Sequence, residues 1–111
     1  MPKSDSAVAL LSDVDKSEYN EKNFYQIAPA MFAKINEKID GRHGNALKLI
    51  YYLIFQLQNN SDFRPAEETI CQNCNFIHSS YVEARKYLIS LGFITHIPFQ
   101  SITIHYKKIM E

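Results

Sequence analysis

The stretch of residues 70–94, ICQNCNFIHSSYVEARKYLISLGFI, constrains the fold of this chain more than any other part. Its first half carries Cys71 and Cys74 at positions that fall on the apolar side of a helix. Asn75 follows where the chain has to turn, because asparagine tolerates the left-handed backbone conformation better than most residues. Phe76 then supplies a large apolar side chain for the corner. This pattern predicts a short helix that ends in a tight turn.

A second helix is predicted after the turn, from about Ser79 to Leu91. The residues of its core side recur at steps of three and four, which places them on one face of a helix. They are Tyr81, Ala84, Leu88 and Leu91. Gly92 stands where a helix ends in a left-handed cap, and an extended run begins at Phe93. The two helices and their turn predict a helix-turn-helix, whose longer helix presents its outer face to a groove.

The order apolar, small, two variable, apolar, turn residue, apolar, followed by a helix ending in Leu-Gly-Phe-Ile, resembles winged-helix DNA-binding domains. It is closest to those of bacterial regulators and of plasmid or phage replication initiators. The upstream runs NFYQIAPAMFAKI and NALKLIYYLIFQL also resemble the N-terminal module of those initiators, so the resemblance covers roughly Asn23 to Lys108. It departs from the family at Ile77, where a capping serine is common, and at Glu83, where a cation is easier to explain.

The resemblance implies binding to double-stranded DNA, in replication initiation or in transcriptional regulation on a bacterial mobile element. Replication initiators usually carry a further domain, so a role as a small transcriptional regulator is expected nearly as strongly as one in replication initiation. A homodimer is a further expectation, because two half-site contacts would then add.

Length and composition agree with one ordinary globular domain. The chain has 111 residues, of which 46% are hydrophobic and 22% charged. No apolar run approaches the ~20 residues of a membrane span, and no signal segment begins the chain, so we expect a cytoplasmic protein whose two cysteines are thiols. We divide it into an acidic flexible leader at 1–22, the winged-helix domain at 23–108 and a tail at 109–111. Within the leader, AVALL at 7–11 is expected either to fray or to form a short docked helix.

Two helices are predicted upstream of the helix-turn-helix. Residues 24–27 alternate and favour an extended segment, whereas Pro29 suits the first position of a helix that ends at Gly41. The inward residues of this helix are Phe32, Ile35 and Ile39. The next helix runs from about Asn45 to Gln58 with Leu47, Ile50, Leu53, Ile54 and Leu57 inward. Aromatic side chains cover much of its remaining circumference, which indicates the most buried helix.

The residues after Gly92 predict two strands and complete the fold class. Residues 93–97 and 102–106 are rich in β-branched and aromatic side chains, and 98–101 separate them. Residues 59–62 are expected to form a loop, and Pro65 to open the first helix of the helix-turn-helix. The prediction is a mainly α (α+β) winged helix-turn-helix, with three or four helices and a C-terminal β-hairpin wing.

The outer side of the second helix predicts the DNA contacts. Ser79 and Lys86 can donate hydrogen bonds, Val82 can meet a thymine methyl group, and Arg85 lies at the flank near phosphate. Glu83 either accepts from cytosine or closes a capping box with Ser80, and its spacing favours the cap. The wing adds three candidates. The full set is His78, Ser79, Ser80, Val82, Glu83, Arg85, Lys86, Gln100, Lys107 and Lys108.

The charge balance keeps a second interpretation open. Twelve Lys and Arg against twelve Asp and Glu give zero net charge, where many nucleic-acid binders are basic. A winged-helix module for protein contact is therefore the alternative. No phosphate loop or nucleophile motif points to an enzyme, and we expect no cofactor, no membrane and no small-molecule substrate. The pair Cys71 and Cys74 with His78 is a weak zinc pattern, because both cysteines fall on core positions.

Overall fold

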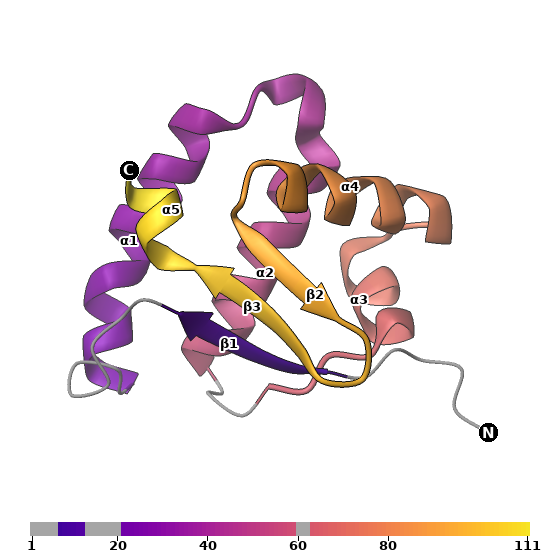
Figure 1. Ribbon diagram of the computed structural model, residues 1–111, viewed down its shortest axis with the longest axis horizontal. Coiled ribbons are helices and arrows are strands. Elements are labelled where there is room, and N and C mark those ends of the chain that lie inside the picture. The colour runs from indigo at the N-terminus through magenta and orange to yellow at the C-terminus, as the bar shows by residue number, and fades with distance from the viewer. Residues whose placement is uncertain (1–6, 13–20, 60–62) are drawn as a thin grey trace.

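The computed structural model describes residues 7–12, 21–59 and 63–111 (Figure 1). They form a mainly helical α+β fold. Its elements, in chain order, are β1 (Val8–Ser12), α1 (Glu21–Lys38), the 3-10 helix η1 (Gly41–His43), α2 (Gly44–Asn59), α3 (Glu67–Cys74), α4 (His78–Ser90), β2 (Ile94–Ile97), β3 (Ser101–His105) and α5 (Tyr106–Met110). No helix in these described ranges is long and apolar enough to cross a membrane.

The sheet has the strand order β1-β3-β2. Strands β2 and β3 form the predicted antiparallel hairpin, and β1 pairs with β3 in parallel. One face of the sheet is buried, because Ala9 pairs with Ile102, and Ile94 pairs with Ile104, and all four side chains are at most 2% exposed. The sheet therefore contains more than the C-terminal hairpin that the sequence predicts.

Strand β1 corrects both expectations for the leader, since it neither frays nor forms a helix. On one side, β1 pairs with β3. On the other side, it bonds to the segment before α3: the N–H of Ala7 donates to the carbonyl of Pro65 (3.1 Å), and the N–H of Ala9 donates to the carbonyl of Phe63 (2.9 Å). Both partners lie far away in the sequence, so local patterning gives no sign of them. The other leader residues, 1–6 and 13–20, and the loop residues 60–62 lie outside the described residues.

Helix α1 corrects two further predictions. It contains residues 24–27, which were expected to be extended, and it carries Pro29 inside the helix rather than at its first position. Ala28, Met31 and Ile35 are fully buried on one face, and this packing outweighs the backbone hydrogen bond that proline removes. The helix ends at Lys38, before Gly41, which instead begins η1.

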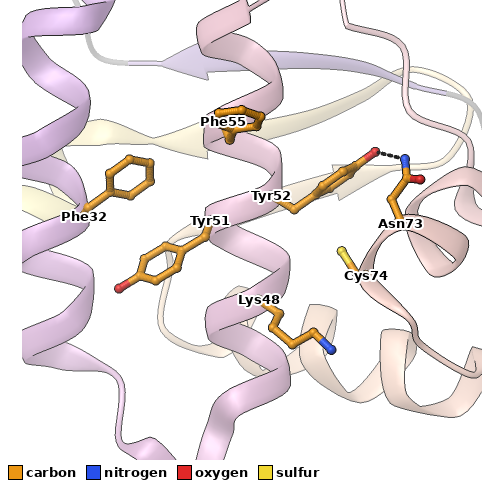
Figure 2. A pocket seen from close by; sticks show the side chains of 7 residues that line it. All are labelled: Phe32, Lys48, Tyr51, Tyr52, Phe55, Asn73 and Cys74. Atoms are coloured by element: carbon orange, nitrogen blue, oxygen red, sulfur yellow. Dashed lines mark hydrogen bonds between the residues drawn. The ribbon is translucent and has the colours of Figure 1, made fainter.

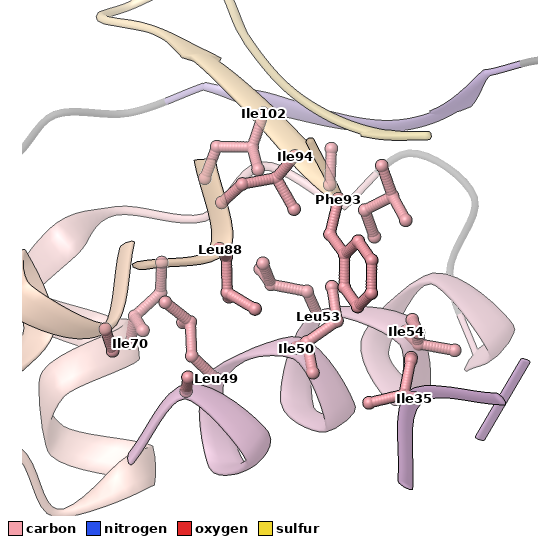
Figure 3. Packing of buried hydrophobic residues seen from close by; sticks show 14 of the residues in the cluster. Ile35, Leu49, Ile50, Leu53, Ile54, Ile70, Leu88, Phe93, Ile94 and Ile102 are labelled. Atoms are coloured by element: carbon pink, nitrogen blue, oxygen red, sulfur yellow. The ribbon is translucent and has the colours of Figure 1, made fainter. Parts of the chain in front are cut away.

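Helix α2 packs across the buried face of the sheet and contacts α1, α3 and α4. Four predicted core residues are confirmed, because Ile50, Leu53, Ile54 and Leu57 are at most 2% exposed, whereas Leu47 is half-buried. Leu49 joins the core beside Ile50, Leu53 and Ile54 (Figure 3). The predicted central position of α2 is confirmed by its contacts with α1, α3, α4 and the sheet, but one side of the helix is open. Lys48 is exposed, Phe55 is 53% exposed, and Tyr51 and Tyr52 are half-buried.

The C-terminal residues form a helix instead of extending the wing. Tyr106, expected at the end of the second strand, is the first residue of α5. Ile109, expected in a tail, is fully buried, and the Lys38 ammonium on α1 donates a hydrogen bond to the carbonyl of Lys108 (3.2 Å). Helix α5 therefore fastens the end of the chain to α1.

Candidate nucleic-acid interface

Helices α3 and α4 are joined by the three residues 75–77, as the sequence predicts. Asn75 has the left-handed conformation (φ 59°, ψ 46°), and its N–H donates to the carbonyl of Gln72 (3.3 Å). The N–H of Phe76 closes the end of α3 on the carbonyl of Cys71 (2.8 Å), and its ring is buried in the corner. The turn is therefore fixed by backbone bonds and by one aromatic side chain.

The inner face of α4 fixes the helix on the core. Tyr81, Ala84 and Leu88 are at most 4% exposed, as predicted, whereas Leu91, predicted on the same face, is half-buried. This face packs toward α2, and Figure 3 shows Leu88 in the core. The helix ends at Ser90 with Leu91 as its C-cap, and Gly92 has the expected left-handed conformation just after it, with a φ of 78°. The N–H of Gly92 reaches the carbonyl of Ile89 (2.9 Å) and that of Phe93 reaches Leu88 (3.0 Å), which together form a Schellman cap.

The first turn of α4 differs from the expected capping box. The helix begins at His78, and Ile77 occupies the N-cap position without a side-chain hydrogen bond. Ser80 is therefore the third helical residue and cannot act as a cap with Glu83. His78 instead pairs with Glu67 in the first turn of α3, so it ties the two helices together. Local sequence patterns do not predict this contact, because its two residues belong to different helices.

The outer face of α4, which we define as His78, Ser79, Glu83 and Lys86, is exposed. Two other candidates are less available than predicted. Val82 is half-buried against the core, and the Arg85 guanidinium lies over the Tyr81 ring, 5.1 Å from its centroid. The helix thus offers donors at Ser79 and Lys86 and an acceptor at Glu83.

Three residues that the sequence analysis missed lie beside this face. Arg42, His43 and Asn45 line a hollow of about 140 Å³ together with Ser80, Glu83 and Tyr87 of α4. The His43 ring stacks on the Tyr87 ring with centroids 3.8 Å apart, which holds η1 against α4. The Arg42 guanidinium stays exposed and bonds to Asp40 (3.0 Å), and this contact lowers the pKa of the Asp40 carboxyl. The only sequence signal was the cationic pair between Gly41 and Gly44.

The three wing candidates do not lie together. Gln100 is exposed in the turn between β2 and β3, beside Phe99, which is 72% exposed and has a φ of 63°. Lys107 and Lys108 belong to α5 and not to the wing, so their assignment is corrected. The Lys108 stem packs near Gly92, at the opposite end of α4 from Ser79, and its ammonium pairs with Glu111 (3.4 Å).

Both cysteines are free thiols, and Cys74 is buried whereas Cys71 is half-buried. Both are unpaired by disulfide, and burial raises the pKa of Cys74 to about 11 and also raises that of Cys71. Within the described residues, no group of three or more His, Cys, Asp and Glu side chains is placed to hold a metal ion.

The chain was also compared with known proteins. No protein-family model, no curated protein and no solved structure matches it. The surface of α4, η1 and the β2–β3 turn is therefore interpreted from its own chemistry. Helix α4, which is fixed at both ends, supplies hydroxyl and ammonium donors and a carboxylate acceptor, and η1 adds the guanidinium of Arg42.

Proposed function

We propose that this domain binds double-stranded DNA as a winged helix-turn-helix, with α4 in the major groove and the β2–β3 hairpin as the wing. One observation carries the proposal: α4 buries Tyr81 and Leu88, follows a left-handed turn, and exposes Ser79, Glu83 and Lys86 on its other side. A major groove is ~12 Å wide and admits a helix whose outer side chains read base edges.

Each exposed group has a role in this proposal. Ser79, near the N-terminus of α4, and Lys86 donate to base edges or phosphate oxygens. Glu83 accepts from the amino group of cytosine, since Ser80 lies inside the helix where no capping box can form. Arg42 extends from η1 toward a flanking phosphate, as its side chain is 85% exposed. The Arg85 guanidinium lies over the Tyr81 ring one turn earlier on the same helix, so we assign Arg85 no direct contact with a base.

We also propose the biological role that the sequence resemblance implies, which is replication initiation or transcriptional regulation on a bacterial mobile element, in the cytoplasm. A homodimer would place two copies of α4 on successive half-sites about one helical turn apart, so its target would be a near-palindrome. Sedimentation of the protein alone and with duplex DNA measures this assembly, and a strict monomer in both samples contradicts it.

The experiment that tests DNA binding is fluorescence anisotropy with a labelled random-sequence duplex at several salt concentrations. We expect binding whose log K falls linearly with log salt, because each neutralised phosphate releases counterions. Selection from a randomised duplex pool then gives the preferred site, and Glu83→Gln should relax preference at one base pair. An absence of binding at low salt contradicts the proposal.

A module for protein contact is the second candidate. It is favoured by the zero net charge and by two exposed apolar side chains, Ile77 at the N-cap of α4 (70% exposed) and Ile89 on α4 (42% exposed). In that case Lys86→Ala leaves the activity unchanged, whereas Ile77→Lys abolishes it. Under the DNA proposal, Lys86→Ala weakens the activity, whereas Ile77→Lys leaves it largely unchanged.

A further inference from the structure

One face of α2 is turned toward an open hollow between α1 and α3 (Figure 2). Lys48, Tyr51, Tyr52 and Phe55 follow the spacing i, i+3, i+4, i+7, so they share one side of the helix. We call these four residues the open face of α2. Phe32 of α1 borders the hollow on one side, and Asn73 and Cys74 of α3 border it on the other. Its volume is about 650 Å³.

The walls of the hollow are aromatic and held in place. The rings of Phe32 and Tyr51 meet edge to face with centroids 5.2 Å apart. The Tyr52 hydroxyl accepts a hydrogen bond from the side-chain amide of Asn73 (2.8 Å), which joins the open face to α3. Aromatic surfaces with a few fixed polar groups are typical of sites for small ligands.

A single cationic side chain, Lys48, lies at one end of the open face of α2. Lys48 is the only one of the seven lining side chains that is charged at neutral pH, because the Cys74 thiol has a pKa of about 11. Its ammonium lies over the Phe76 ring, 5.2 Å from the centroid. None of the ion pairs formed among the described residues involves Lys48. The hollow therefore has a mainly apolar lining with one positive charge that can pair with an anion.

The size of the hollow, about 650 Å³, and its single ammonium suit a small ligand with an anionic group. Drug-sized ligands occupy sites of ~300–1,000 Å³. We propose that the open face of α2 binds a small hydrophobic organic anion, with its charged group on Lys48 and its apolar body against Tyr51, Tyr52 and Phe55.

The site also adjoins the turn that leads to α4. Cys74 is the last residue of α3, and Phe76, beneath the Lys48 ammonium, is the corner residue of the turn. An anion that draws Lys48 away from Phe76 changes the packing at the base of α4. We expect the ligand to alter DNA affinity in this way, and this coupling rests on the proposed function, whereas ligand binding itself does not.

The binding test uses two dyes of nearly equal shape. Anilinonaphthalene sulfonate is a hydrophobic anion, and its parent phenylnaphthylamine lacks the sulfonate. Each dye is titrated into the full chain, and fluorescence gives its dissociation constant. We expect saturable binding of both dyes, with the anion at least about fivefold tighter, because only the anion pairs with Lys48.

Three variants locate the site. Lys48→Met keeps the length of the side chain but removes its charge, so it should remove the preference for the anionic dye and leave the neutral dye unchanged. Lys34→Met is the matched control, since Lys34 lies on α1 beside Glu37 and does not line the hollow. Phe55→Ala should weaken both dyes, and circular dichroism checks that each variant is folded.

The outcomes separate the two proposals. No saturable binding, or equal binding of both dyes to the wild type, overturns the ligand site, and so does an unchanged dye preference in folded Lys48→Met. Anisotropy with labelled duplex is then repeated with saturating anionic dye. A shift in DNA affinity that Lys48→Met abolishes supports the coupling, and an unchanged affinity overturns it. If no duplex binds while the anionic dye still binds through Lys48, the DNA function fails and the ligand site stands.

Discussion

The outer face of α4 and the open face of α2 are exposed sides of two helices that pack against each other through their buried sides. Their chemistry is opposite. The face of α4 carries an imidazole, a hydroxyl, a carboxylate and an ammonium, and the face of α2 carries three aromatic rings and one ammonium. A polar face suits a charged, hydrated partner such as DNA, and an aromatic one suits a small apolar ligand. The domain therefore has two surfaces that substitutions can change separately.

The largest expected effect is on the free energy of unfolding, which should differ between substitutions on the buried side of α2 and on its open face. Ile54→Ala removes a fully buried side chain and should lower the free energy of unfolding by roughly 2–5 kcal/mol. Phe55→Ala, at the next residue, changes a side chain that is 53% exposed and should cost about 1 kcal/mol or less. Urea unfolding followed by circular dichroism measures both. Equal losses would show that the open face is part of the core.

A backbone substitution tests how α4 is held at its C-terminal end. Gly92→Ala places a Cβ at a φ of 78° and 3.3 Å from the Lys108 stem, so we expect a loss of about 1–2 kcal/mol in the free energy of unfolding. Gly44→Ala is the control, because Gly44 has a helical φ of −58° and open space at its Cβ. It should raise the free energy of unfolding by about 0.5 kcal/mol. Similar losses in both variants would contradict the cap.

The next prediction compares two lysines that the sequence placed in the same interface. Lys86→Ala should weaken binding of a random duplex about three- to tenfold and reduce the slope of log K against log salt by about one, because it removes a phosphate or base contact. Lys107→Ala should leave both unchanged, since Lys107 lies on α5. Anisotropy titrations measure the pair, and a greater effect of Lys107 contradicts the assignment of the face to α4.

The smallest effect concerns the two thiols of α3. At pH 8 we expect iodoacetamide to modify the half-buried Cys71 before the buried Cys74, because only the thiolate reacts. The Cys74 pKa of about 11 means that its rate should rise about tenfold per pH unit until that value is reached. Mass spectrometry of peptides measures both rates. Faster modification of Cys74 at pH 8 would contradict its burial beside the hollow.

Local sequence patterns predicted several elements of this fold. Asn75, the inner face of α4 and Gly92 were predictable because each depends on neighbours within a few residues. Strand β1 and the contact between His78 and Glu67 were not, since they depend on residues far along the chain or on another helix.

Hydrophobicity explains the error on the open face of α2. A polar residue in the sequence is a good indicator of an exposed side chain, but apolar side chains are found both in cores and on binding surfaces. Tyr51, Tyr52 and Phe55 therefore looked like core residues, although Lys48 shares their side of the helix. That lysine was the available signal that this side is open.

The most direct test of DNA binding by α4 is the pattern of amide chemical-shift changes when a duplex is added to nitrogen-15-labelled protein. We predict the largest changes at residues 78–86, with smaller ones at 42–45 and near Gln100, and little change at the open face of α2. Changes centred on residues 48–55, or no changes at low salt, would contradict the account.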